Sequence, residues 1–267
     1  MSAAVVARVV RSHEVMGTVA SVHVHDHADP AVVDTAIDAT WAELDRLEAV
    51  FSTFRNSSEI SRINRGELHV LDASAEVIEV VDACTWLEHA SDGAFRARRP
   101  GDTLLDPAGF VKGWAAELAG QHLDRAGLQH WYLSVGGDIQ TRGTSGDGSP
   151  WRIAIADPNS DDPRSICAFV EVSGDAVATS GTAARGRHLW DGRTGEASCA
   201  LASMTVVGPH LTWADAFATT AFVMGLDGLD WVAQFDGYRA VAITLEGQLV
   251  SRQPDWRSPA EHHASMA

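Results

Sequence analysis

The stretch GFVKGWAAELAGQHLDRAGLQHWYLSV, residues 109–135, decides the fold class of this 267-residue chain. Its first part, Gly109–Ala126, reads as a helix. Gly127 is suited to ending that helix, because glycine readily adopts the left-handed backbone found at helix C-termini. Trp131–Val135 then reads as a short apolar strand. The sequence therefore changes here from long helices to short strands.

Before this stretch, the pattern predicts one strand and three helices. Val19–Val24 is rich in β-branched residues and reads as an early strand. Apolar residues then recur at helical spacing, and the predicted helices are Ala31–Phe51 with Pro30 at its start, Ser58–Asn64 with Ser57 or Ser58 as its cap, and Ala73–Ala90.

After this stretch, short β-type runs are separated by Gly, Asp, Ser and Pro. The predicted strands are Trp151–Ala156, Ala168–Val172, Ala176–Ser180 and Met204–Val207, followed by a helix over Thr212–Met224 and a hairpin of Tyr238–Leu245 and Gln248–Ser251 around Glu246 and Gly247. Because helices and strands do not alternate regularly, we expect an α+β fold with mixed helices and antiparallel or mixed sheets. Residues 1–267 are expected to form one domain or two closely packed subdomains, with residues 254–267 as a frayed tail.

Composition and charge limit the classes of partner. Lys+Arg number 20 and Asp+Glu 36, which gives a formal net charge of −16 and argues against nucleic acid as a partner. The first residues, MSAAVVARVVRSHEVMGT, lack the features of a secretory signal, and no apolar run is long enough to span a membrane. Three widely spaced cysteines fit neither a disulfide set nor a zinc site. We expect a cytoplasmic protein.

The segment LDPAGFVKGWA, residues 105–115, places an acid, a turn and the only lysine of the chain at a helix start. Backbone N–H groups at a helix N-terminus favour phosphate, and the ammonium of Lys112 would add a positive charge. The alternative is an ordinary capped helix with Lys112 in solvent. A second segment, SVGGD at residues 134–138, either lets a ligand lie against the backbone or makes a tight turn.

Two further segments contain residues able to do chemistry. In ATSGTAARGRHLWDGRTG, residues 178–195, His188 follows hydroxyls and glycines and is either a base or ligand in a pocket or a structural histidine. In TWADAFAT, residues 212–219, Asp215 and Thr219 share one helix face and could hold a hard cation such as Mg²⁺. The alternative is that Asp215 forms a capping box with Thr212.

The histidines of HVHDH, His23, His25 and His27, fall at alternate strand positions and so share a face. We interpret them as a solvent-facing edge of the N-terminal strand, because no matching ligand cluster occurs elsewhere in the sequence.

Taken in order, these segments resemble the ApbE family of FAD:protein FMN transferases, and the match covers most of the chain. The matching pieces are Met16-Gly17-Thr18, FSTFRNSSEISRIN (residues 51–64), SDGAF (91–95), LDPAGFVKG (105–113), SVGGDIQTRG (134–143), TSGTAARGRHLWDGRTG (179–195) and WADAFATTAFVMG (213–225). The resemblance implies an ApbE-like fold. It also implies a Mg²⁺-dependent enzyme that transfers FMN from FAD onto a Ser or Thr hydroxyl of an acceptor protein and releases AMP.

The resemblance also implies roles for particular residues. Asp215, Thr219 and the carbonyl of Gly109 fall at the metal ligands, and His188, Asp215 and Lys112 at the catalytic positions. The implied FAD contacts are Met16, Phe54, Ala94, Phe95, Arg96, Asp106, Lys112, His188 and Ala218. The base that accepts the acceptor's proton is His188 or a nearby carboxylate.

Alternatives to transfer remain open at this stage. The same site could act as a Mg²⁺-dependent FAD pyrophosphatase with water as the acceptor, or the protein could bind flavin without catalysis. Mn²⁺ would suit the same oxygen ligands as Mg²⁺. The chain departs from the family pattern after Phe95, where Arg96, Ala97, Arg98 and Arg99 replace an acid and a longer segment.

Overall fold

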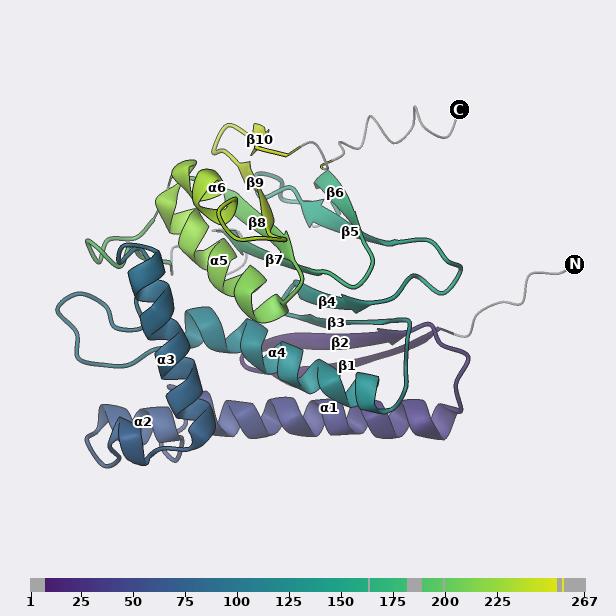
Figure 1. Cartoon of the computed structure of the whole chain (residues 1–267), viewed down its shortest axis with the longest axis horizontal. Coiled ribbons are helices and arrows are strands. Elements are labelled where there is room, and N and C mark those ends of the chain that lie inside the picture. The colour runs from purple at the N-terminus through teal and green to yellow at the C-terminus, as the bar shows by residue number, and fades with distance from the viewer. Residues whose placement is uncertain (1–7, 163, 182–188, 199, 254–255, 257–267) are drawn as a thin grey trace, which may run out of the picture.

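The computed structural model describes residues 8–162, 164–181, 189–198, 200–253 and 256. In chain order its elements are β1 (Val9–Val15), β2 (Thr18–Val24), α1 (Pro30–Phe51), α2 (Glu59–Asn64), the 3₁₀ turn η1 (Val70–Asp72), α3 (Ala75–Ala90), α4 (Ala108–Arg125), β3 (Trp131–Val135), β4 (Asp138–Arg142), β5 (Trp151–Ala156), β6 (Ile166–Val172), β7 (Ala176–Gly181), β8 (Ser203–Gly208), α5 (Leu211–Met224), α6 (Asp227–Val232), β9 (Arg239–Ile243) and β10 (Leu249–Ser251). The α+β prediction is confirmed (Figure 1).

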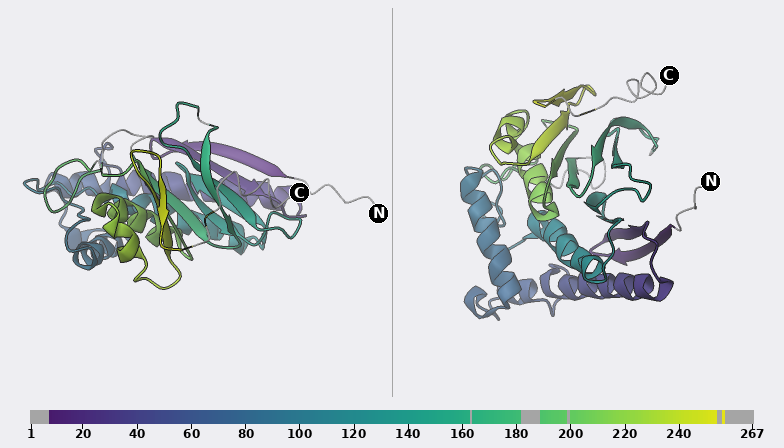
Figure 2. Two further views of the ribbon diagram at one scale, coloured as in Figure 1. Left: turned by 90° about the horizontal axis from the view of Figure 1, so that it is seen from above. Right: turned by 45° about the vertical axis from the view of Figure 1, so that its right-hand side comes forward.

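Eight strands form one sheet in the order β1-β2-β3-β4-β7-β8-β9-β10, and β5 and β6 form a separate ribbon. Every strand pair among the described residues is antiparallel. Helices α4 and α5 lie side by side across one face of the large sheet, and α1 runs beneath α4 and along β1 (Figures 1 and 2). This stacking brings helix α4 and helix α5 together where the site is built.

Alternation along the central strands fills two cores. In β8, Val206 packs into the main core under the helices, whereas Val207 packs into a second core under the β5–β6 ribbon. The same alternation puts Ala242 of β9 in the main core and Val241 in the second. Because both faces of these strands are covered, every residue of β8 is buried, including the polar Ser203 and Thr205.

The predicted element boundaries agree to within a few residues, and Ser58 is the side-chain cap of α2. Four elements were not predicted, namely β1, the 3₁₀ turn η1, β4 and α6. β1 explains an error in the interpretation of the histidines, because it pairs outside β2 and makes β2 an interior strand. His25 is only 7% exposed and packs on Trp151, so the prediction that these histidines lie on a solvent-facing edge is wrong. Burial, with a smaller contribution from His25, lowers the pKa of His23.

No helix in the described part of the chain is long and apolar enough to cross a bilayer. The two described cysteines, Cys84 and Cys167, are free thiols, and burial raises the pKa of Cys84 to about 12. The predicted frayed tail lies outside the described residues except for Trp256.

Candidate functional site

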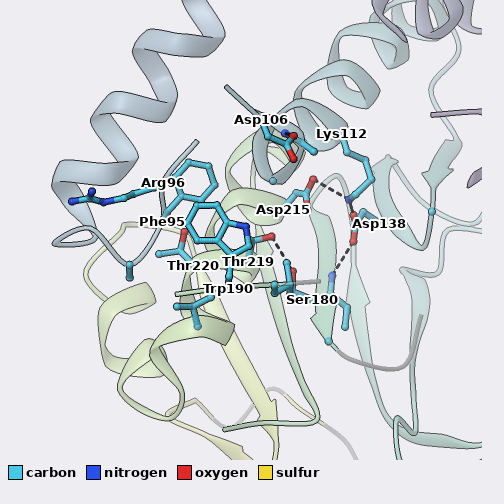
Figure 3. A pocket seen from close by; sticks show the side chains of 18 of the residues that line it. Phe95, Arg96, Asp106, Lys112, Asp138, Ser180, Trp190, Asp215, Thr219 and Thr220 are labelled. Atoms are coloured by element: carbon cyan, nitrogen blue, oxygen red, sulfur yellow. Dashed lines mark hydrogen bonds and ion pairs between the residues drawn. The ribbon is translucent and has the colours of Figure 1, made fainter. Parts of the chain in front are cut away.

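A cavity of about 420 Å³ lies where α4, α5 and the ends of β4 and β7 meet. Segments from much of the chain line it, and the lining residues are Thr53, Phe54, Ala94, Phe95, Arg96, Asp106, Ala108, Gly109, Lys112, Gly136, Asp138, Thr179, Ser180, Gly181, Leu189, Trp190, Asp215, Thr219, Thr220 and Val223. Figure 3 shows Asp106, Asp138 and Asp215 gathered around Lys112, with Arg96 on the opposite side beyond Phe95.

The start of α4 forms one wall. The carboxylate of Asp106 accepts the backbone N–H of Ala108 at 3.1 Å, which turns the chain into the helix. At Gly109 an added Cβ would lie 3.1 Å from the Phe95 ring, so glycine lets the ring and the helix approach closely. Lys112 follows about one turn later and points into the cavity, so the interpretation of a solvated lysine on a plain helix is wrong.

Lys112 lies between two buried carboxylates (Figure 3). Its Nζ is 2.9 Å from Oδ2 of Asp215 and also pairs with Oδ2 of Asp138. Asp138 and Asp215 are 3% and 4% exposed, so both charges would be costly without this cation. Asp138 comes directly after the Gly136-Gly137 turn of the β3–β4 hairpin, where both glycines have positive φ. SVGGD therefore makes a tight turn and also reaches the cavity.

Helix α5 supplies a carboxylate and a hydroxyl on one face. Asp215 accepts the backbone N–H of Gly113 at 2.8 Å, and Thr219 exchanges a 3.0 Å hydrogen bond with Ser180 of β7. The predicted capping box of Thr212 and Asp215 is wrong, because α5 begins at Leu211 and the Thr212 hydroxyl donates to Glu117 instead. Asp215 is therefore turned toward α4 and the cavity rather than toward its own helix start.

Aromatic and apolar side chains line the rest of the cavity. Phe54 is 95% exposed although it lines the cavity, which leaves its ring available to a ligand. Phe95, Leu189 and Trp190 line it as well. A planar ligand with a charged end would therefore meet rings on one side and the Lys112 group on the other.

Most of the residues singled out from the sequence come together here. Those that line the cavity are Phe54, Ala94, Phe95, Arg96, Asp106, Gly109, Lys112, Asp215 and Thr219. Ala218 is fully buried in α5 and does not line it. Met16, with a positive φ in the β1–β2 turn, packs against the main core and is not among the lining residues either. His188 lies outside the described residues.

Sequence reasoning did not single out several lining residues, notably Asp138, Ser180 and Trp190. Asp138 directly follows the glycine pair of SVGGD, and Ser180 lies near the end of a predicted strand. These positions, where a backbone turn can expose a side chain to a ligand, were the features of the sequence that could have identified them. Among the lining carboxylates, Asp106 is the one that makes no ion pair with any described residue.

Comparison with known proteins identifies a family. The model of the ApbE family matches residues 16–98 and 96–242. A protein of Escherichia coli (strain K12) named FAD:protein FMN transferase is 30% identical over 200 residues, which is 70% of this chain and 56% of that protein. One of the same name from Vibrio cholerae is 32% identical over 153 residues, 54% of this chain and 46% of that protein. The chain thus spans about half the length of these curated relatives.

Solved structures share the fold. A flavin transferase ApbE from Vibrio cholerae has a TM-score of 0.76 at 24% identity, with 92% of this chain and 97% of that chain covered. The ApbE protein of Thermotoga maritima has a TM-score of 0.79 at 20% identity, with 96% and 99% covered.

Proposed function

Because this chain belongs to the ApbE family, we propose that it transfers FMN from FAD to a Ser or Thr hydroxyl of an acceptor protein, with Mg²⁺ as cofactor and AMP as the second product. Two curated relatives are named for FMN transfer from FAD to protein. The observation that carries the proposal is the group of Lys112, Asp215 and Thr219 in a cavity that is also lined by aromatic rings.

The residues present suit a hard cation. Oδ2 of Asp215 is taken by Lys112 and Gly113, whereas Oδ1 has no partner among the described residues. Thr219 offers a hydroxyl on the same face of α5. Gly109 lines the same cavity, and the N–H of Gly113, four residues later in α4, donates to Asp215. Asp215, Thr219 and the Gly109 carbonyl would therefore hold the metal through oxygen, as Mg²⁺ prefers.

Such a site would combine few side chains with substrate oxygens. Within the described ranges, no three His, Cys, Asp or Glu side chains gather into a metal-binding group. Magnesium commonly completes its coordination with water and substrate phosphate, so this is consistent with the oxygen set above. When bound, Mg²⁺ supplies positive charge that stabilises the phosphate oxygens during cleavage of the pyrophosphate.

The side chains of the protein would bind and orient the two reactants. The Lys112 ammonium offers a second positive charge to the pyrophosphate, and the exposed Phe54 ring offers a surface for a flavin or adenine ring. The attacking hydroxyl must lose its proton, and the candidate acceptors are His188 and the carboxylate of Asp106, which makes no ion pair with any described residue. The acceptor segment would enter the cavity from solvent.

The direct test is to incubate the purified protein with FAD and Mg²⁺, with and without a flavinylation-motif acceptor domain. AMP is followed by chromatography and covalent flavin by in-gel fluorescence. Transfer predicts AMP together with a fluorescent acceptor band. AMP without a band in either sample would replace the proposal with FAD hydrolysis.

A variant at the metal position separates catalysis from mere binding. Asp215→Ala should abolish AMP release while FAD binding, measured by quenching of flavin fluorescence, persists. Wild-type protein that binds FAD and yields neither product would contradict both enzymatic functions and leave a flavin-binding protein.

A further inference from the structure

Asp138 is a buried carboxylate to which the proposed chemistry gives no role. It is the first residue of β4, and its side chain is held at both oxygens. Oδ1 accepts the backbone N–H of Thr179 at 2.9 Å, and Oδ2 pairs with Lys112. The turn, β7 and α4 thus fix the carboxylate in one position, aimed at the only lysine of the chain.

The Lys112 ammonium and the proposed divalent cation would compete for the same carboxylate, Asp215, and Asp138 can remove this competition. The Lys112 Nζ lies 2.9 Å from Oδ2 of Asp215, the carboxylate that would also hold the divalent cation. Like charges repel strongly at such separations in a partly dry cavity, so a metal ion at Asp215 would drive the ammonium away. Conversely, an ammonium that depends on Asp215 alone would compete with the metal for that carboxylate.

We propose that Asp138 is a positioning residue, whose negative charge holds the Lys112 ammonium in the cavity so that Asp215 is free to bind the divalent cation. With Asp138 present, two carboxylates share the ammonium, and one of them can turn to the metal without leaving Lys112 unpaired. Asp138 acts through Lys112 and needs no contact with the substrate. The metal and the reaction in this inference rest on the proposed function. The ion pairs of Lys112 with Asp138 and Asp215 are seen in the structure.

Metal binding gives a test that does not depend on turnover. Binding of Mn²⁺ alone is measured from the signal of free Mn²⁺ in electron paramagnetic resonance, for wild type, Asp138→Asn, Lys112→Met and the double variant. We expect Asp138→Asn to weaken Mn²⁺ binding about tenfold when Lys112 is present, and less than about threefold in the Lys112→Met background. An equal loss in both backgrounds would overturn the inference, as would wild-type protein that binds no Mn²⁺.

If Asp138→Asn fails to fold, Mn²⁺ binding by Lys112→Met alone also tests whether the ammonium competes with the metal for Asp215. Without its ammonium, Asp138 becomes an uncompensated negative charge beside Asp215. Mn²⁺ binding should therefore tighten, while AMP release is lost. Weaker Mn²⁺ binding by a folded Lys112→Met protein would contradict the assigned role.

Kinetics supply the second readout. Asp138→Asn and Lys112→Met should each lower kcat for AMP release by about 30-fold or more, and the double variant should be no slower than the slower single variant. The matched control is Asp26→Asn, a carboxylate at the other end of β3 that accepts the backbone N–H groups of Gln129 and His130. It should lose stability without changing kcat. Losses that multiply in the double variant would overturn the inference.

If wild type releases no AMP, the proposed function fails and the Mn²⁺ measurements still decide the role of Asp138. The two failures are therefore distinguishable.

Discussion

Thr219 reaches the cavity with its hydroxyl already engaged by a neighbour. Ser180 Oγ lies 3.0 Å from Thr219 Oγ1, and Ser180 is buried at the end of β7. This bond fixes the direction of the Thr219 lone pairs before any cation arrives. We predict that Ser180→Ala raises the Mg²⁺ concentration needed for half-maximal AMP release several-fold, because an unoriented hydroxyl is a poorer ligand.

The control for this prediction is a second hydroxyl pair that also starts from β7 but joins it to β8 instead of α5. Thr205 Oγ1 lies 2.8 Å from Thr179 Oγ1, and Thr205 does not line the cavity. Thr205→Val should cost about 1 kcal/mol of stability, as Ser180→Ala does, and leave the Mg²⁺ requirement unchanged. Equal Mg²⁺ requirements in the two variants would refute the orienting role of Ser180.

The sequence indicates those site residues that share one element, and misses those brought together by the sheet. Asp215 and Thr219 are four apart on one helix, so their common face follows from helical geometry. Asp138 and Ser180 instead belong to β4 and β7, whose pairing depends on long-range contacts that local periodicity does not contain. The helical residues were therefore identifiable as a pair, and their partners on the sheet were not.

At the scale of elements, the contact between α4 and α5 depends on one missing side chain. A Cβ added at Gly113 would lie 2.6 Å from the Asp215 Cβ and 2.7 Å from the Leu211 carbonyl oxygen. Gly113→Ala must therefore push the two helices apart and displace Asp215. We predict a loss of about 1–3 kcal/mol in urea unfolding together with at least a tenfold loss of AMP release.

Gly120, two turns further along α4, provides the comparison. Its Cβ would meet Oε1 of Gln140 at 2.6 Å, the far end of a flexible side chain that can move, and the Trp131 ring at 3.0 Å, and these nearest contacts include no atom of α5. Gly120→Ala should be less destabilising than Gly113→Ala and should retain activity. If the two substitutions affected AMP release equally, the prediction that the close contact between α4 and α5 at Gly113 positions Asp215 would be wrong.

Helices α1 and α3 are joined by a charge network whose contribution depends on pH. Arg46 of α1 binds Glu43 and, at the first turn of α3, Glu76. Its hydrogen bond to Glu43 holds the pKa of that carboxyl below the ordinary value. A carboxyl group whose pKa is lower in the folded state than in the unfolded state stabilises the protein at pH values above its unfolded-state pKa. This stabilisation is lost as the pH falls through the folded-state pKa.

We therefore expect Arg46→Met to lower the free energy of unfolding at pH 7 by at most about 1 kcal/mol, since the network is partly exposed. The difference from wild type should shrink as the pH falls below about 4.3, the ordinary value for glutamate. Thermal unfolding between pH 7 and pH 3 measures this. Arg164→Met, at a pair whose arginine side chain is 89% exposed, serves as the control and should change nothing. A difference that does not shrink at all between pH 7 and pH 3 would contradict the linkage.

The elements predicted well are those with a strong local signal. Pro30 and the apolar spacing of α1 mark a long helix, whereas β1 has exposed residues and a charged middle that hide its strand character. Its pairing with β2 and its contact with α1 hold it in place. The short helix α6 follows Gly225 and packs its buried Trp231 against Phe217. Tertiary contacts, rather than periodicity, form both elements.

At the scale of the whole molecule, the cavity joins parts of the chain that are far apart in sequence. Its lining runs from Thr53, just after α1, to Val223 near the end of α5. A ligand that fills it would touch the loop after α3, both central helices and the sheet together. Such a ligand stabilises the folded state as a whole, because unfolding would have to release it.

We predict that FAD and Mg²⁺ raise the thermal midpoint together by more than the sum of their separate effects. At about 100 times its Kd, a ligand adds about 2.7 kcal/mol, which for a chain of this size corresponds to a rise of roughly 5–10 °C. Asp215→Ala should retain part of the rise with FAD alone and lose the extra rise from Mg²⁺, because the Asp215 carboxylate would help to hold the metal. Differential scanning calorimetry of both proteins, with each ligand alone and with both, makes the measurement. No rise with FAD would refute the cavity as its site, and a Mg²⁺ effect that survives Asp215→Ala would place the metal elsewhere.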